Sequence, residues 1–372
     1  MRILFQGAGA IGIAGAALFG DRHETVVVTR TPLERPQAVY PLRVGWFDEL
    51  AHDGASGVDA ALDAASTRRV TITDWAGIEE AGGFRLKPGR NDGVANGGAG
   101  RGPGGSRIDD GDPDSEATAR RGAGVSITEA RRHWQRGRSR RARDRRIQDS
   151  WDLVVLTTRP GDLDEDVAAA IRAVAPRWVA ITSQVDGDLE VARSLFPGAE
   201  VVVFGPAFLS ERTTSHTVRY WTPLGATAFF VAGSAETVRR LTRALGSLVL
   251  PVPLEALLVP PAVFMPFVAE LSIDGGEWDE LLTHLRRPSD AAAEAVRAVT
   301  GVPVPILPAV ARAVLELAER ASPIPMREYA GRHFARHGGQ TLAMLDGWIA
   351  RATEHAALTE IVEQLRTKAD RY

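Results

Sequence analysis

The sequence predicts an α/β fold in two parts: a doubly wound, mostly parallel sheet over about residues 1–250, and an all-helical part over about residues 251–372. Three observations lead to this prediction. A strand, a glycine-rich turn, a helix and a second strand follow one another from the first residues. After residue 152, apolar strands alternate with helical segments, and after residue 251 only helical spacing remains. In such sheets, ligands bind beyond the carboxyl ends of the strands.

The first unit places three glycines between its strand and its helix. Residues 3–5 are apolar as in a buried strand, residues 10–19 are small and apolar with helical spacing, and residues 26–28 form the next strand. Gly7, Gly9 and Gly12 have the G-x-G-x-x-G spacing, which permits a tight turn, a close backbone approach to a pyrophosphate, and helix–strand packing. The sequence therefore predicts a dinucleotide site. Its cofactor-binding residues are Gly7, Ala8, Gly9, Ala10, Ile11 and Gly12.

Arg30 bears on the choice between the two nicotinamide dinucleotides. It follows the second strand, where an NAD-binding protein usually places an acid for the ribose 2′-hydroxyl. A cation flanked by the hydroxyls of Thr29 and Thr31 suits a 2′-phosphate instead, so NADP is the expected cofactor. A secretory signal is the alternative for residues 3–20, but the glycine spacing and the lack of a convincing cleavage site favour the nucleotide site.

The later elements follow from apolar runs separated by Gly and Pro. Expected strands lie at residues 69–73, 152–158, 178–183, 201–204, 217–221 and 227–232, with helices at 163–174, 188–195 and 235–245. Helical segments are then expected at 259–271, 278–285, 289–299, 308–321, 326–355 and 358–368.

Residues 82–147 interrupt this pattern and read as a disordered insertion. They are rich in Gly, Asp and Arg, and end in a basic tract at residues 131–146. Their composition cannot bury enough apolar surface to offset the ordering entropy, although a short helix is expected near 127–134. Residues 84–150 carry about seven more basic than acidic side chains, so the rest of the chain is acidic. Nucleic-acid binding is not expected, because no aromatic interleaving or folded nucleic-acid module accompanies the basic tract.

The composition narrows the classes of protein. The 372 residues are 44% hydrophobic and 24% charged, as in ordinary globular proteins, and allow two domains. No uninterrupted apolar run is expected to reach the length of a membrane span once Gly, Pro and charged residues are counted. The absence of cysteine excludes disulfides and thiolate chemistry and fits a cytoplasmic location. No acyl-hydrolase elbow or phosphate-binding GxxxxGK[ST] motif occurs.

The succession of motifs resembles the ketopantoate reductase (2-dehydropantoate 2-reductase) family, as a divergent member. The resemblance rests on the glycine turn followed by Arg30, the strand ending in Thr158 and Arg159, the segment at residues 181–187, and the helical stretch at 333–341. It implies an NADPH-dependent reductase of 2-keto acids, with a role in pantothenate biosynthesis. It also implies that Thr158 and Arg159 lie beside the cofactor, and that Gln184 stands where the family has an asparagine near the nicotinamide and the substrate.

The resemblance fails at the proton donor. The family uses a lysine on the first helix of its helical domain, but the only lysines here are Lys87 and Lys368. Reduction of a ketone places negative charge on oxygen and needs a proton donor or a cation there. The candidates for the catalytic role are Gln184, Glu270 and His333, the last with His337 one helical turn later. His216 and Tyr220 are further candidates.

Most of these candidates also have an interpretation without any functional role. Glu270 could be an exposed side chain at a helix end, the two histidines a solvated polar face, and His216 and Tyr220 ordinary loop polarity. No metal site is expected, because no HExxH motif or third ligand accompanies the histidines. Two functions stay open: a reductase of a small-molecule carbonyl compound, compatible with a homodimer, and a catalytically degenerate NADP-binding regulatory or interaction protein.

Overall fold

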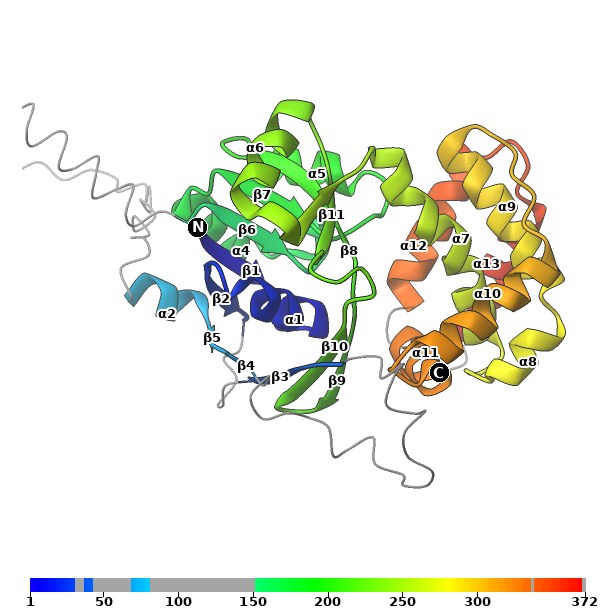
Figure 1. Cartoon of the computed structure of the whole chain (residues 1–372). Helices are drawn as coiled ribbons and strands as arrows, with labels where there is room; N and C mark the ends of the chain where they lie inside the picture. Colours follow the sequence, from blue (N-terminus) through cyan, green and yellow to red (C-terminus); the bar gives the residue numbers. More distant parts are fainter. Residues whose placement is uncertain (31–36, 43–67, 81–150, 336–337, 370–372) are drawn as a thin grey trace, which may run out of the picture. The chain divides into compact units, whose positions relative to one another are not determined.

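The computed structural model describes residues 1–30, 37–42, 68–80, 151–335 and 338–369, except the side chains of 331–335 and 369 (Figure 1). The insertion expected at 82–147, with its helix near 127–134, lies outside the described residues. The described part contains two sheets, helices on both faces of the larger one, and a helical C-terminal region. The predicted α/β class is confirmed.

The larger sheet has eight strands in the order β12-β11-β8-β7-β6-β1-β2-β5. All neighbours are parallel except β11 and β8. The bounds are β1 (Arg2–Gln6), β2 (Glu24–Val28), β5 (Ile72–Thr73), β6 (Leu153–Leu156), β7 (Trp178–Ile181), β8 (Glu200–Pro206), β11 (Phe229–Ala232) and β12 (Val249–Pro251). Strand β1 pairs with both β2 and β6. The chain therefore adds strands first on one side of β1 and later on the other, and a ligand crevice is expected at this switch point.

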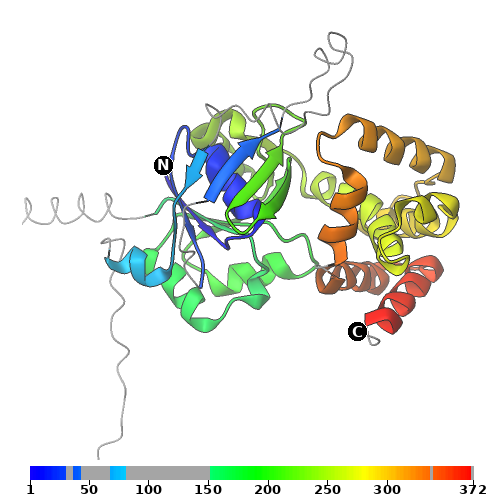
Figure 2. The same ribbon diagram turned by 90° about the horizontal axis from the view of Figure 1, so that it is seen from below.

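Different helices cover the two faces of this sheet (Figure 2). The helices are α1 (Ala10–Phe19), α2 (Trp75–Glu80), α4 (Glu165–Val174), α5 (Asp188–Leu195) and α6 (Ala235–Leu245), with short 3-10 turns η2 (Pro160–Asp162) and η3 (Gly246–Leu248). Side chains alternate along β1, so Phe5 packs with α1 and α6, whereas Leu4 packs with α4 and α5. This arrangement is the predicted doubly wound sheet.

A second sheet was not predicted. Its order is β4-β3-β10-β9, with bounds β4 (Arg68–Val70), β3 (Gln37–Pro41), β10 (Thr217–Trp221) and β9 (Leu209–Thr214). Residues 69–73, expected as one strand, divide between β4 in this sheet and β5 in the larger one. Val39 and Val218 pack on α1 in the same core cluster as the large sheet. The short, small-residue helix α1 is therefore buried from two sides, which explains why it has almost no polar face.

The helical region begins after β12. It contains α7 (Leu254–Ile273), α8 (Trp278–Thr283), α9 (Arg286–Thr300), α10 (Pro308–Ala321), α11 (Met326–Ala335), α12 (Gly338–Arg351) and α13 (Ala356–Ala369). The run expected at 326–355 is therefore two helices, α11 and α12. By length and composition alone, α7 could cross a membrane, although three prolines and two glutamates interrupt its apolar sequence. In the structure, α7 packs against α9 and α13 through residues such as Ala262 and Ala269.

Candidate active site

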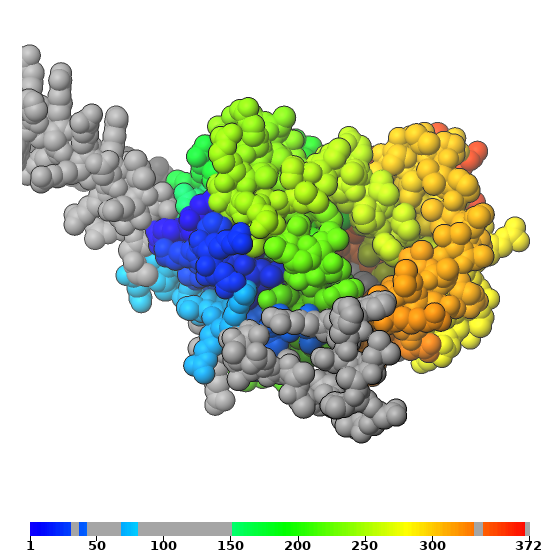
Figure 3. Space-filling view, in the orientation of Figure 1, coloured from blue at the N-terminus to red at the C-terminus, as the bar shows by residue number. Residues whose placement is uncertain are grey.

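A cleft of about 1170 Å³ opens at the carboxyl ends of the strands around β1. Its sheet-side lining is Gln6, Gly7, Ala8, Gly9, Ala10, Ile11, Thr29, Arg30, Thr157, Thr158, Arg159, Asp162, Leu163, Val167, Thr182, Ser183, Glu211 and Arg212. Its helical lining is Met265, Tyr329, Gly339, Gln340, Thr341 and Met344. The molecular surface is recessed between the green strands and the orange helices (Figure 3). The cleft therefore lies where a doubly wound sheet binds its ligand.

The glycine turn has the geometry that its motif predicts. Gly7 has a φ of 113°, which disfavours any other residue, and a Cβ there would lie 2.5 Å from the Thr157 hydroxyl. A Cβ on Gly12 would lie 2.1 Å from the Gly7 carbonyl oxygen, so only glycine lets α1 approach the turn. Thr157 Oγ1 also hydrogen-bonds the carbonyls of Gln6 and Gly7, at 3.0 and 3.1 Å. The neighbouring strand β6 thus fixes the turn.

Gly9 differs from its two partners. A Cβ at Gly9 would have no atom within 4 Å, and its φ of −72° is ordinary, so neither the fold nor the backbone conformation requires glycine here. Gly9 is the N-cap of α1 and lines the cleft, and the first turn of α1 contains no acidic residue. The positive end of the helix dipole and its backbone N–H groups are therefore offered to the cleft. A pyrophosphate fits this cradle.

Arg30 lies beside the cleft, next to Thr29. Its Nε is 2.9 Å from Asp164 Oδ2, and its Nη2 donates to the Asp162 carbonyl at 3.2 Å. Asp164 is the N-cap of α4 and accepts a hydrogen bond from the Val167 amide. The Arg30 side chain is 64% exposed, so this ion pair is screened by solvent and contributes little stability. A phosphate could replace it at small cost.

Arg159 belongs to a buried polar network at the cleft wall. Its Nε and Nη2 both donate to Asp188, each at 3.1 Å, and the Ser183 hydroxyl donates to the same carboxylate. Asp188 is only 3% exposed and begins α5. The hydrogen bond to Asp188 is the main cause that raises the pKa of Arg159. The network joins the ends of β6 and β7 and holds the Arg159 and Ser183 side chains in the lining.

Arg212, on β9, was missed by the sequence analysis because it belongs to the unpredicted second sheet. It donates to the Ala8 carbonyl in the glycine turn, to Gln37 Oε1 at 2.8 Å and to the Ser215 carbonyl at 3.1 Å. These three acceptors are neutral, and burial lowers the pKa of the guanidinium. Arg212 therefore brings positive charge to the turn and fixes the orientation of the Ala8–Gly9 peptide. No motif in the sequence marks this residue.

The helical wall of the cleft is mostly apolar or uncharged. Helix α7 contributes Met265, α11 contributes Tyr329, and α12 contributes Gln340 and Thr341. Tyr329 is 6% exposed, and burial together with the charge of Glu211 raises the pKa of its phenol well above the usual value. The phenol is therefore protonated at neutral pH. Among the described residues that line the cleft, none is a lysine.

The structure brings eight of the predicted site residues into the lining: Gly7, Ala8, Gly9, Ala10, Ile11, Arg30, Thr158 and Arg159. Gly12 and Gln184 are not in the lining; Gly12 is buried behind the turn, and the Gln184 amide lies close to Gly205. Gly12 thus acts through packing.

The other predicted proton donors whose side chains the structure describes lie outside the cleft lining. Glu270 is fully buried in an ion pair with Arg287, outside the lining, so it is neither an exposed helix-end residue nor a cleft residue. His333 falls in α11, but its side chain and the whole of His337 lie outside the described residues. His216 and Tyr220 do not line the cleft: Tyr220 is in the core of the second sheet, where burial raises its pKa.

No family model matches the sequence, and no curated protein matches it significantly. Solved structures do match. The dimeric ketopantoate reductase of Staphylococcus aureus has a TM-score of 0.56 at 10% identity, covering 100% of this chain and 99% of its own. The fold is that of the ketopantoate reductases. The 2-dehydropantoate 2-reductase of Geobacter metallireducens also matches, with a TM-score of 0.56 at 12% identity over 99% of this chain and 100% of its own.

A second activity occurs on the same fold. D-mandelate dehydrogenase, solved with NADH, has a TM-score of 0.52 at 10% identity and covers 100% of this chain and 99% of its own. The ketopantoate reductase fold predicted from the sequence is therefore confirmed across both parts of the chain. At these identities, the matches establish the fold alone.

Proposed function

We propose that the protein is a divergent ketopantoate reductase family member that binds NADPH in the cleft and reduces a 2-keto acid or a related carbonyl compound. Gly9 carries the proposal. Neither packing nor backbone conformation requires glycine there, but a ligand approaching the N-terminus of α1 does. The two-part organisation, residues 1–250 for the cofactor and 251–372 for the substrate, belongs to the same proposal.

The cofactor side is proposed to act as follows. Residues 7–11 bind the pyrophosphate, and Arg212 supports the turn through the Ala8 carbonyl and adds positive charge. Arg30 exchanges Asp164 for the 2′-phosphate, which favours NADPH over NADH. Thr158 and Arg159 contact the rest of the cofactor from the end of β6. When bound, the nicotinamide supplies the hydride.

The substrate side must place a proton donor beside the developing oxyanion. We propose the Tyr329 phenol, because it lines the cleft from the helical side and has a hydroxyl proton at neutral pH. Thr341, on α12, is the other hydroxyl that the described helical residues contribute to the lining. Gln184 and Glu270, both outside the lining, fit this role less well than Tyr329.

The first experiment is a fluorescence titration of NADPH against the purified full-length chain. Binding in the micromolar range is expected, and the Gly9→Ala variant should bind much more weakly at unchanged melting temperature. No binding by the folded wild-type protein would contradict the proposal. A screen of 2-keto acids, with NADPH oxidation as the readout, then tests turnover. A Tyr329→Phe variant should lose turnover while keeping NADPH affinity.

One observation favours a second candidate, an NADP-binding protein without turnover. Helix α7 offers Met265 to the cleft, whereas the family is expected to have a lysine on this helix. Lys368 donates to the carbonyls of Ser272 and Ile273 at the other end of α7, and Lys87 lies outside the described residues. The same screen separates the two candidates: NADPH binding without a steady-state rate on any 2-keto acid would favour the second.

A further inference from the structure

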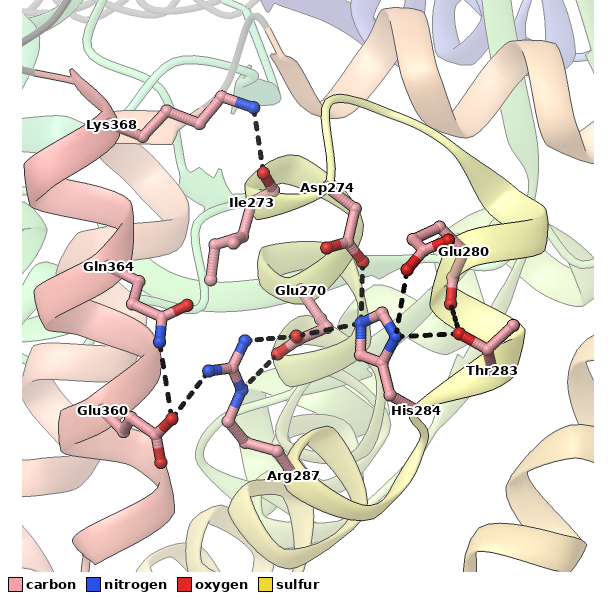
Figure 4. A network of polar contacts seen from close by, with 10 residues as sticks. All are labelled: Glu270, Ile273, Asp274, Glu280, Thr283, His284, Arg287, Glu360, Gln364 and Lys368. Carbon is pink, nitrogen blue, oxygen red and sulfur yellow. Dashed lines mark hydrogen bonds and ion pairs between the residues drawn. The ribbon is translucent and has the colours of Figure 1, made fainter.

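Three side chains that can bind a metal ion meet at the C-terminal end of α7, outside the cleft. Glu270 and Asp274 lie one helical turn apart, and His284 follows α8 (Figure 4). The His284 Nε2 atom is 3.0 Å from Asp274 Oδ2 and 3.4 Å from Glu270 Oε1. The three ligand atoms all lie within 4.8 Å of one another. None of the three residues lines the cleft.

Thr283 contacts the His284 ring on the side away from the two carboxylates. The Thr283 hydroxyl donates to the Glu280 carbonyl at 2.8 Å, and its oxygen lies 3.1 Å from His284 Nδ1, within hydrogen-bonding distance. The other ring nitrogen, Nε2, faces the carboxylates of Asp274 and Glu270. One ring nitrogen and two carboxylate oxygens therefore converge on one point.

The surrounding charge also favours a cation. Four carboxylates lie in this network, those of Glu270, Asp274, Glu280 and Glu360, against two permanent cations, Arg287 and Lys368. The C-terminal end of the 20-residue helix α7 adds the negative end of its dipole. The network thus has excess negative charge at the point that His284 Nε2 faces.

We propose that Glu270, Asp274 and His284 bind one divalent cation, Zn²⁺, with water as the fourth ligand. In a tetrahedral zinc site with bonds of about 2.0–2.2 Å, neighbouring ligand atoms are about 3.3–3.6 Å apart. The separation of 3.4 Å between Nε2 and Glu270 Oε1 falls in this range, and the separation of 3.0 Å between Nε2 and Asp274 Oδ2 is shorter, as in a hydrogen bond. One nitrogen and two carboxylate oxygens are a ligand set that zinc accepts. The side chain of His284 is 37% exposed, so the ion can enter from solvent.

The neighbouring residues hold two of the proposed ligands in place. Arg287 donates to both oxygens of Glu270, with Nε at 2.9 Å from Oε2, and also to Glu360 at 2.7 Å. Thr283 orients the imidazole through Nδ1, as in zinc sites where the second ring nitrogen is hydrogen-bonded. The bound ion would tie the end of α7 to the segment between α8 and α9. The site is independent of the proposed reductase activity.

The test uses the full-length chain, freed of metal by dialysis against a chelator and titrated with ZnCl2 by calorimetry. Asp274→Asn and His284→Ala should each weaken the site's Zn²⁺ binding by more than about 100-fold, and Thr283→Val by about tenfold. The control is His355→Ala, which removes the histidine that directly precedes α13, outside the cluster, and should leave binding unchanged. Zn²⁺ should also raise the melting temperature of the wild type, but not that of His284→Ala.

Two results would overturn the proposal. The first is a folded wild-type chain that binds neither Zn²⁺ nor Co²⁺ at high micromolar concentration. The second is full retention of the bound Zn²⁺ by Asp274→Asn and His284→Ala. Circular dichroism verifies that each variant is folded, and Asp274→Asn keeps the size of the side chain. In the wild type, Co²⁺ should give visible absorption of tetrahedral intensity, which His284→Ala should lose.

Discussion

The two walls of the cleft are built differently. The sheet side depends on backbone geometry within one short segment: the positive φ of Gly7, the contact of Gly12 with the turn, and the open space at Gly9. The helical side depends on single side chains from three helices, Met265 and Tyr329 among them. The comparison teaches that a binding function built on local backbone conformation leaves a motif, whereas one assembled from distant side chains leaves none.

The largest effect is expected within the glycine turn itself. Gly12→Ala would place a Cβ 2.1 Å from the Gly7 carbonyl oxygen, and this backbone contact cannot be relieved by a side-chain rotation. We expect a loss of about 1–3 kcal/mol of stability and no measurable NADPH binding. The matched control is Gly9→Ala, with no atom within 4 Å of its Cβ, which should melt like the wild type but bind NADPH at least about tenfold more weakly.

Thermal melting and fluorescence titration separate the two variants. If Gly9→Ala bound NADPH as well as the wild type, the pyrophosphate would not lie at this turn, and the sheet side would lose its proposed role. If Gly12→Ala remained stable and bound NADPH, the packing between α1 and the turn would be looser than the structure indicates.

The second largest effect is expected at Arg212, which connects β9 of the second sheet to the glycine turn of the larger one. Arg212→Met removes the hydrogen bond to the Ala8 carbonyl and a positive charge beside the turn. A hydrogen bond to a charged group contributes about 1.5–3 kcal/mol, so NADPH affinity should fall by roughly tenfold or more. Arg212→Lys keeps the charge and should recover part of it. As a control, Arg243→Met on α6, outside the cleft lining, should leave the affinity unchanged. Equal affinities in Arg212→Met and the wild type would show that the turn needs no support from β9.

The difference between Gly12 and Arg212 shows how much could be predicted from the sequence. Strand, turn, helix and strand are contiguous, so the first unit and the lining from Gly7 to Ile11 could be predicted from residue types and spacing. The second sheet could not, because β3 pairs with β4 and β10, which lie far away in the chain, and because β9, although it forms a hairpin with β10, has a mostly polar sequence. Arg212 belongs to that sheet. The ion pair of the buried Glu270 could not be predicted either, because its partner Arg287 comes from another helix.

The third effect is smaller because Arg30 is exposed. Arg30→Ala should weaken NADPH binding about fivefold while leaving NADH binding nearly unchanged, since only the 2′-phosphate gains a charge-assisted partner. Asp164→Asn provides the matched opposite change. It releases Arg30 from its ion pair, yet asparagine still caps α4, so the preference for NADPH should increase or stay constant. An unchanged ratio of NADPH to NADH affinity in Arg30→Ala would remove the proposed basis for NADP.

The smallest effect should follow a change at residues 84–147, which lie outside the described residues. Strand β1 pairs directly with β6, so the sheet side joins across this segment. The entropic cost of closing a flexible loop changes by only about 0.6 kcal/mol for each doubling of its length. Replacing residues 84–147 by a short Gly-Ser linker should therefore leave the melting temperature and the NADPH affinity nearly unchanged. A fall of more than several degrees would mean that the segment packs on the sheet side, which would then not be complete as described.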